Sequence, residues 1–252
     1  MLAVFGKDSQ LRAVAFGYAC HNTTLASFEW SGDYAGFAQR ELQRRHPNCI
    51  AMFWEGCGGD QNPLPRRTVE LAQQYGEQLA EAVDKTLGGG QGMRDVQGGL
   101  RARYAEIDLP LGRLPSREEL QSEAKSTNKY VAARANYWID HIDSGKSLSA
   151  SYPYPVQSWR VGDDIQFVFL GGEVVVDYAI RLKQQHGDEP MGHKNVWVAG
   201  YSNDVMAYIP SRRVLVEGGY EGAGAMVYYG LPTVWSPEAE EAIAAEVKRQ
   251  SE

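Results

Sequence analysis

Cysteine, basic charge and long apolar runs are all scarce in this chain of 252 residues. Its three cysteines, Cys20, Cys49 and Cys57, form no CxxC pair, so they predict neither a disulfide framework nor a thiolate zinc cluster. The formal net charge of −7 argues against nucleic-acid binding, because phosphate backbones are bound by basic surfaces. No apolar run reaches the roughly 20 residues of a membrane-spanning helix, so no transmembrane segment is expected.

Several local signatures are missing as well. The N-terminus has no charged region followed by a long apolar stretch, so the sequence predicts no signal peptide. The glycine-rich segment GCGGDQNP, residues 56–63, is followed by no GK[ST], and GxSxG is absent from the chain. These absences argue against a P-loop and a nucleophile elbow. The glycines of residues 56–63 either let backbone amides approach a ligand or make a tight turn.

The chain does contain an alternation of apolar strands with patterned helices. Strands are predicted for residues 11–20, 49–54, 100–109, 154–161, 165–170, 195–199 and 225–229. Helices are predicted for residues 33–46, 66–87, 116–144, 173–186 and 236–250. The hydrophobic content of 43% is enough to bury a core. The alternation predicts an α/β fold in which mixed β-sheet layers are flanked by helices.

Local signals mark the ends of several predicted helices. Ser116 with Glu119 three residues later forms a capping-box pattern, and Gly145 is a natural helix stop. Ser236 is predicted to be the N-cap of the last helix. The glycine-rich segment at 88–92 is predicted to be a flexible break.

Three predicted strands are followed by polar side chains with metal-binding or acid–base chemistry. His21 ends the first strand, Glu173 follows the hairpin at 154–170, and Tyr208 follows the strand at 195–199 after a short polar loop. Ligand sites of α/β proteins tend to lie beyond the carboxyl ends of strands. An imidazole, a carboxylate and a phenol could together bind zinc, which accepts nitrogen and oxygen donors.

Each of these three residues also has a structural alternative. His21 could be a hydrogen-bonded histidine at a strand end, and Glu173 could satisfy the free amides of a helix N-terminus. Tyr208 could be a core aromatic residue with its hydroxyl at the surface. The residue pattern alone leaves both interpretations open.

Four segments, taken in order, resemble sequence blocks of one enzyme family. They are FGYACHNTT with SGDYAGFAQ, GGDQNP, FLGGEVVVDYAIRLK, and GYSNDVMAYIPSRRVLVEGGYEG, at residues 16–39, 58–63, 169–183 and 200–222. The chain thereby resembles the catalytic domain of the neutral/alkaline, non-lysosomal ceramidases over most of its length. The resemblance implies one catalytic-type domain over residues 1–252, without the family's N-terminal part and its C-terminal immunoglobulin-like domain.

The resemblance also implies a metal and roles for individual residues. That family binds Zn²⁺ with two histidines, one glutamate and one tyrosine, which would make His21, Glu173 and Tyr208 ligands here. Tyr220 matches a tyrosine that lies near the substrate carbonyl. The family's first histidine has no matching position in this chain.

Two residues of the segment at 58–63 are expected to assist catalysis. Asn62 stands where the family has a serine; it could donate a hydrogen bond to an oxyanion but cannot act as a nucleophile. Asp60 is expected to orient a neighbouring ligand or loop amide.

The expected function is therefore zinc-dependent hydrolysis of the amide bond of an N-acyl lipid, such as ceramide, in lipid or sphingolipid metabolism. One alternative is a non-catalytic ceramidase-like α/β binding module with an incomplete metal site. Another is a cysteine or serine hydrolase using Cys20 or Cys57. Secreted or periplasmic localisation is expected from the resemblance. Tyr137, Trp138 and Ile139 either pack on the domain or form the wall of a groove for an acyl chain.

Overall fold

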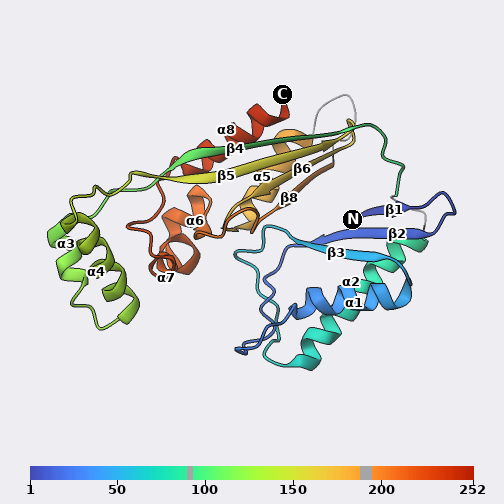
Figure 1. Cartoon of the computed structure of the whole chain (residues 1–252), viewed down its shortest axis with the longest axis horizontal. Coiled ribbons are helices and arrows are strands. Elements are labelled where there is room, and N and C mark those ends of the chain that lie inside the picture. Colours follow the sequence, from blue (N-terminus) through green and yellow to red (C-terminus); the bar gives the residue numbers. More distant parts are fainter. Residues whose placement is uncertain (90–92, 188–194) are drawn as a thin grey trace. The chain divides into compact units, whose positions relative to one another are not determined.

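The computed structural model describes residues 1–89, 93–187 and 195–252, and it divides into two compact units, Met1–Gln97 and Gly98–Glu252 (Figure 1). Each unit combines β-sheet with helices, which confirms the predicted mixed α/β fold. That residues 1–252 act as one catalytic domain stays a prediction. Residues 90–92 of the predicted flexible break lie outside the described residues. Within the described residues, no helix is both long and apolar enough to cross a membrane.

The first unit is a three-stranded sheet covered by two helices. Its strands are β1 (Leu2–Phe5), β2 (Leu11–Tyr18) and β3 (Ile50–Glu55), in the order β1-β2-β3. Strand β1 is antiparallel to β2, whereas β2 and β3 are parallel, because helix α1 (Asp33–Arg45) connects them. Helices α1 and α2 (Val69–Gly88) lie together on one side of this sheet (Figure 1).

Apolar side chains of one sheet face and of both helices form the core of this unit. The core residues are Val14, Phe16, Ala38, Leu42, Cys49, Ala51, Ala80 and Val83. Gly76 lets α2 approach α1 closely: a Cβ atom there would lie 2.5 Å from Cβ of Phe37 and 2.7 Å from O of Tyr34. Gly76 and Val83, which recur at helical spacing, therefore mark the face of α2 that packs inward.

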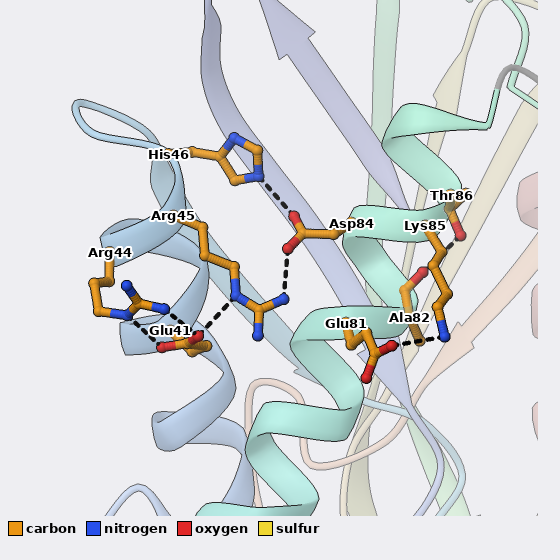
Figure 2. A network of polar contacts seen from close by, with 9 residues as sticks. All are labelled: Glu41, Arg44, Arg45, His46, Glu81, Ala82, Asp84, Lys85 and Thr86. Atoms are coloured by element: carbon orange, nitrogen blue, oxygen red, sulfur yellow. Dashed lines mark hydrogen bonds and ion pairs between the residues drawn. The ribbon is translucent and has the colours of Figure 1, made fainter.

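A polar network joins the C-terminal part of α1 to α2 (Figure 2). Arg45 binds Glu41 on its own helix and Asp84 on α2, with nitrogen–oxygen distances of 2.7 Å in both cases. Nε2 of His46 lies 2.6 Å from the other carboxylate oxygen of Asp84. Asp84 therefore fixes the end of α1 through two different side chains.

The second unit is built on a four-stranded sheet of order β4-β5-β6-β8. Its strands are β4 (Leu100–Pro110), β5 (Ser151–Val161), β6 (Ile165–Leu170) and β8 (Asn195–Ala199). Strands β4, β5 and β6 are antiparallel, and β8 is parallel to β6. The predicted hairpin of β5 and β6 is confirmed, with Gly162 at positive φ in its turn.

Two helices of the second unit pack on this sheet, and two others connect its two longest strands. Helices α3 (Arg117–Glu123) and α4 (Lys129–Asp143) lie between the far ends of β4 and β5 (Figure 1). Helix α8 (Ala239–Ser251) packs on β4 and β5, and α5 (Val176–Gly187) packs on β8. A separate sheet of two residues per strand pairs β7 (Glu173–Val174) with β9 (Tyr208–Ile209).

A continuous helix over 116–144 was a wrong prediction, because residues 124–128 separate α3 from α4. The predicted capping box of Ser116 and Glu119 does begin α3. Asn128 then starts a new helix, since its side chain accepts a hydrogen bond from N of Tyr130 at 3.0 Å. Short polar side chains favour such caps over helix interiors. Gly145 has φ of 85° just after α4, as predicted for a helix stop.

The structure corrects two predictions in the C-terminal region. The strand expected at 225–229 is helix α7 (Met226–Tyr229), which ends at Gly230 in the left-handed conformation. Five apolar residues are too few for periodicity to separate strand from helix. Glu238, and not Ser236, occupies the N-cap position of α8. The hydroxyl of Ser236 donates a hydrogen bond to the carboxylate of Glu238.

Candidate functional site

The candidate site residues fall into two groups, one in each unit. His21, Asp60 and Asn62 belong to the first unit, whereas Glu173, Tyr208 and Tyr220 belong to the second. Among the described residues, no group of three or more histidine, cysteine, aspartate or glutamate side chains gathers at one place. The two groups are therefore described separately.

His21 lies just past the carboxyl end of β2, next to the loop that follows β3. Because β2 and β3 are parallel, both chain segments leave the sheet at the same edge. The backbone N–H of His21 donates to O of Gln61 at 2.9 Å, which joins the segment after β2 to this loop. The imidazole is buried, with 8% of its surface exposed. Two loops that are distant in sequence thus hold His21 in place.

One ring nitrogen of His21 has a defined role. Nε2 lies 3.0 Å from the carbonyl oxygen of Gly59. A carbonyl only accepts hydrogen bonds, so Nε2 carries the proton, and the lone pair of the neutral ring belongs to Nδ1. Histidines that bind metals commonly donate their second ring N–H in this way. The orientation of His21 therefore fits a ligand that binds through Nδ1.

The glycines of residues 56–59 allow backbone segments to pack closely. A Cβ atom at Gly58 would lie 2.6 Å from Oε1 of Glu55 and 2.9 Å from N of Cys20. At Gly56 it would lie 2.9 Å from Cβ of Ala19. Both contacts are too short for a real side chain, so these glycines serve the close approach of the loop to the end of β2. This supports the tight-turn interpretation for Gly56 and Gly58.

Asn62 has an orientation set by two donors. Its Oδ1 accepts hydrogen bonds from Oγ1 of Thr23 at 3.3 Å and from a guanidinium nitrogen of Arg66 at 2.9 Å. Because these bonds use the carbonyl end of the exposed amide, the NH₂ group remains available as a donor. Asp60 is half-buried in the same loop.

In the second unit, Glu173 and Tyr208 lie directly opposite each other. They are register partners of the parallel pair β7–β9. The next pair along, Val174 and Ile209, points to the opposite face and is buried, at 0% and 1% exposed. Burial of this apolar pair determines the register, and the register places the carboxylate beside the phenol.

The chain around this pair is held by backbone contacts that only glycine permits. Gly172 has φ of 74°, and a Cβ atom there would lie 2.6 Å from O of Ala207. The N–H of Gly172 donates to O of Asp204 at 2.8 Å, and the N–H of Tyr201 donates to O of Gly172 at 2.8 Å. The loop between β8 and β9 is thereby fastened to the segment that precedes Glu173.

Three phenols surround the Glu173 carboxylate. The hydroxyls of Tyr229 and Tyr208 donate to it, and that of Tyr201 lies 3.4 Å from Oε2. Burial raises the pKa of Tyr208, and the Glu173 charge and hydrogen bond raise it further. Without a cation, Tyr208 is therefore a neutral phenol at neutral pH.

Sequence reasoning missed Tyr201 and Tyr229 as neighbours of Glu173. Nothing in the local sequence of Tyr229 separates it from the other tyrosines, because only the fold brings it to Glu173, 56 positions away in the chain. The position of Tyr201 directly after β8 and Gly200 was an available signal of the kind that selected His21. It could have been found in that way.

Tyr220 lies beside Tyr208 in the second unit. Their ring centroids are 5.4 Å apart, and Tyr220 is 50% exposed. It begins a short π-helix, Tyr220–Gly224, a type of distortion that often occurs at functional sites. Burial and then the charge of Glu173 raise its pKa, so it is a hydrogen-bond donor at neutral pH.

The donor chemistry of both groups fits zinc. His21 has Nε2 directed at a backbone carbonyl, the orientation of a ligand that binds through Nδ1, while Glu173 and Tyr208 present a carboxylate and a phenol side by side. A dication next to Tyr208 would reverse the effect of Glu173 and lower the pKa of the phenol. Burial is the first cause of the raised pKa of Tyr208, and the charge of Glu173, which a cation would neutralise, is the second.

The cysteine-hydrolase alternative has little support. Burial raises the pKa of the Cys20 thiol to about 11, and the charges of Glu55 and Asp33 add to this shift. At neutral pH the side chain is a thiol and not the reactive thiolate. Cys57 is 0% exposed and therefore out of reach of a substrate.

Comparison with known proteins identifies solved structures that share this fold. No family model matches the sequence, and no curated protein matches it. The structure matches that of neutral ceramidase from Pseudomonas aeruginosa with a TM-score of 0.64 and 19% identity, over 98% of this chain and 46% of that one. The fold is that of a neutral ceramidase. A second structure, described as ceramidase complexed with C2, gives a TM-score of 0.67 and 17% identity, over 98% and 47% of the two chains.

The similarity to neutral ceramidase predicted from the sequence blocks is thus confirmed for the fold. This chain spans about half the length of the ceramidase chains that it matches. At identities of 19% and 17% the likeness shows the fold alone. Activity, metal and substrate therefore have to be argued from the residues.

Proposed function

We propose that this chain acts as a zinc-dependent hydrolase that cleaves the amide bond of an N-acyl lipid, such as ceramide. The observation that supports this most strongly is the pairing of Glu173 with Tyr208 across β7 and β9. A carboxylate and a buried phenol side by side are an unfavourable pair when the phenol ionises, unless a cation is bound. The neutral ceramidase fold supports the same reaction class.

In this proposal His21, Glu173 and Tyr208 hold the metal. Zinc, when bound, would polarise the amide carbonyl and lower the pKa of a bound water. His21 would contribute Nδ1, because its Nε2–H is engaged by Gly59. Tyr201 and Tyr229 would orient the Glu173 carboxylate through their hydroxyls.

Two further side chains would stabilise the negative charge that develops on the carbonyl oxygen. Tyr220 keeps its proton at neutral pH, and Asn62 has its NH₂ group available because Thr23 and Arg66 occupy its Oδ1. Loss of one such donor costs about 10²–10³ in turnover in well-studied hydrolases. Asp60 would act through the loop, by orienting a loop amide or a ligand.

The test of this proposal measures metal and activity on the same samples. Zinc content and hydrolysis of N-acylsphingosine would be compared for the parent chain, His21→Ala and Glu173→Ala, with circular dichroism as the folding control. Since the two residues lie in different units, a shared ion predicts that each variant loses both properties. Full zinc content in either variant would reject that ligand set.

The alternative is a non-catalytic binding module with the same fold. One observation favours it: Asn62 has no hydroxyl that could act as a nucleophile. This alternative predicts a folded chain that retains lipid binding but shows neither stoichiometric zinc nor amide hydrolysis. The metal measurement above separates it from the hydrolase.

A further inference from the structure

The first unit contains a cavity of about 530 Å³ whose lining includes the candidate residue Asn62. This volume lies within the range of sites that bind small ligands. Helix α2 forms one wall, the loop that starts at Asn62 forms another, and Cys20 and Tyr34 close the end next to β2. All of its lining residues belong to the first unit, so the cavity is a property of that unit alone.

The lining has the chemistry of a site for an apolar chain. None of the residues that line it is charged. The hydroxyl of Tyr75 donates to O of Pro65 at 2.6 Å, and the hydroxyl of Tyr34 donates to O of Cys20. Because both phenols already have backbone acceptors, they present ring carbon to the cavity. Phosphate and sugar ligands would find few partners on these walls.

The helical spacing of α2 explains why this wall is apolar but only partly buried. One face of the helix carries Gly76, Ala80 and Val83, which are buried against α1 and the sheet. The neighbouring face carries Tyr75 and Leu79, four residues apart, and these are only partly buried. Covering the second face with an apolar ligand would be favourable, by about 25 cal/mol for each Å² of apolar surface removed from water.

We propose that this cavity binds the acyl chain of the amide substrate, with the carbonyl group at Asn62. This inference rests on the proposed hydrolase function. An acyl chain is apolar from its first methylene, and the walls next to Asn62 match that property. The amine half of an N-acylsphingosine has hydroxyl groups close to its nitrogen, which would leave polar groups unpaired in this cavity.

Binding of a fluorescent long-chain fatty acid to the whole chain tests the cavity without depending on catalysis. Leu79→Trp would fill the space between α2 and Tyr34, and we expect it to weaken this binding at least tenfold. Gln74→Trp adds the same indole to an exposed position of α2 outside the lining, and we expect it to bind like the parent. Circular dichroism checks that both variants fold.

A second variant covers the case in which Leu79→Trp does not fold. Ala82 is exposed at the rim of the same cavity, so Ala82→Trp should be tolerated and should also weaken binding of the fatty acid. Binding that is absent from the parent, or equal in the parent, Ala82→Trp and Gln74→Trp, would overturn the proposal.

Chain-length selectivity separates this inference from the proposed function. If the parent hydrolyses N-acyl amides, Ala82→Trp should shift its preference from long to short acyl chains, whereas Gln74→Trp should not. Hydrolysis with an unchanged chain-length profile in Ala82→Trp would refute the cavity assignment and leave the hydrolase standing. Fatty-acid binding that Ala82→Trp weakens, without any hydrolysis, would support the cavity and count against the hydrolase.

Discussion

The two units place their candidate residues by different means. In the first unit, His21 and Asn62 lie on loops that follow parallel strands, and hydrogen bonds to loop backbone or neighbouring side chains fix them. In the second unit, Glu173 and Tyr208 are fixed by strand pairing, because the buried Val174 and Ile209 determine their register. A change in the first unit should therefore act on one side chain, whereas a change in the second should disturb the pair together.

Removing a proposed ligand from either unit should have the largest effect. Glu173→Ala and His21→Ala should each lower zinc affinity by more than about 100-fold. Loss of a residue that only hydrogen-bonds to a metal ligand already costs up to about 100-fold, and loss of a ligand should cost more. Equilibrium dialysis against zinc buffers measures this in both variants. A normal affinity in His21→Ala together with a large loss in Glu173→Ala would show that only the second unit binds the metal.

Backbone substitution at Gly172 should disturb the second unit through its register. Gly172→Ala meets both a positive φ and O of Ala207 at 2.6 Å, so we expect a loss of about 2–3 kcal/mol in unfolding free energy. Gly145→Ala is a matched control, because its φ is 85° but no atom lies within 4 Å of the added Cβ. It should lose only about 1 kcal/mol. Equal losses in denaturant unfolding would show that contact with Ala207 has no role.

Ionisation of Tyr208 offers a test that is specific to the second unit. Burial and Glu173 raise the pKa of this phenol, so in metal-free protein the tyrosinate form appears only at high pH. Bound zinc should lower that pKa and produce the tyrosinate signal in ultraviolet difference spectra at a lower pH. Tyr208→Phe should remove the signal. A zinc-dependent signal that persists in this variant would assign it to another tyrosine.

The smallest effect is expected at the network that joins α1 to α2 in the first unit. Asp84→Asn removes the partner of Arg45 and His46 and should cost about 1 kcal/mol of unfolding free energy. Burial opposes ionisation of Asp84, but Arg45 and His46 outweigh it and lower its pKa below 3.8. The stabilisation is thus present above pH 3.8 and is lost as pH falls below that value. Urea unfolding of the parent and Asp84→Asn from pH 3 to pH 6 measures this, and a constant difference would contradict it.

Local patterns predicted much of the fold. The hairpin at Gly162, the capping box at Ser116 and the stop at Gly145 each depend on a few adjacent residues, and the structure has all three. The break before Asn128 was missed because α3 and α4 have similar polar patterns.

The arrangement of site residues was less accessible from the sequence. Glu173 and Tyr208 were selected by their positions after strands, but their pairing joins residues 35 positions apart through a sheet of two residues per strand. No periodicity exists over so short a sheet. Tyr229 was missed for a related reason, since its contact with Glu173 depends on the packing of α7.

The short β7–β9 sheet also limits how the second unit can change. Sliding either strand by one position would exchange the two faces of that strand, which would separate Val174 from Ile209 and the Glu173 carboxylate from the Tyr208 phenol. Such a slipped alignment would break up the buried apolar pair, so it is disfavoured. An insertion or deletion of a single residue in the loop at 200–207 need not shift this pairing, so the length of that loop is freer to vary than the four residues that it aligns.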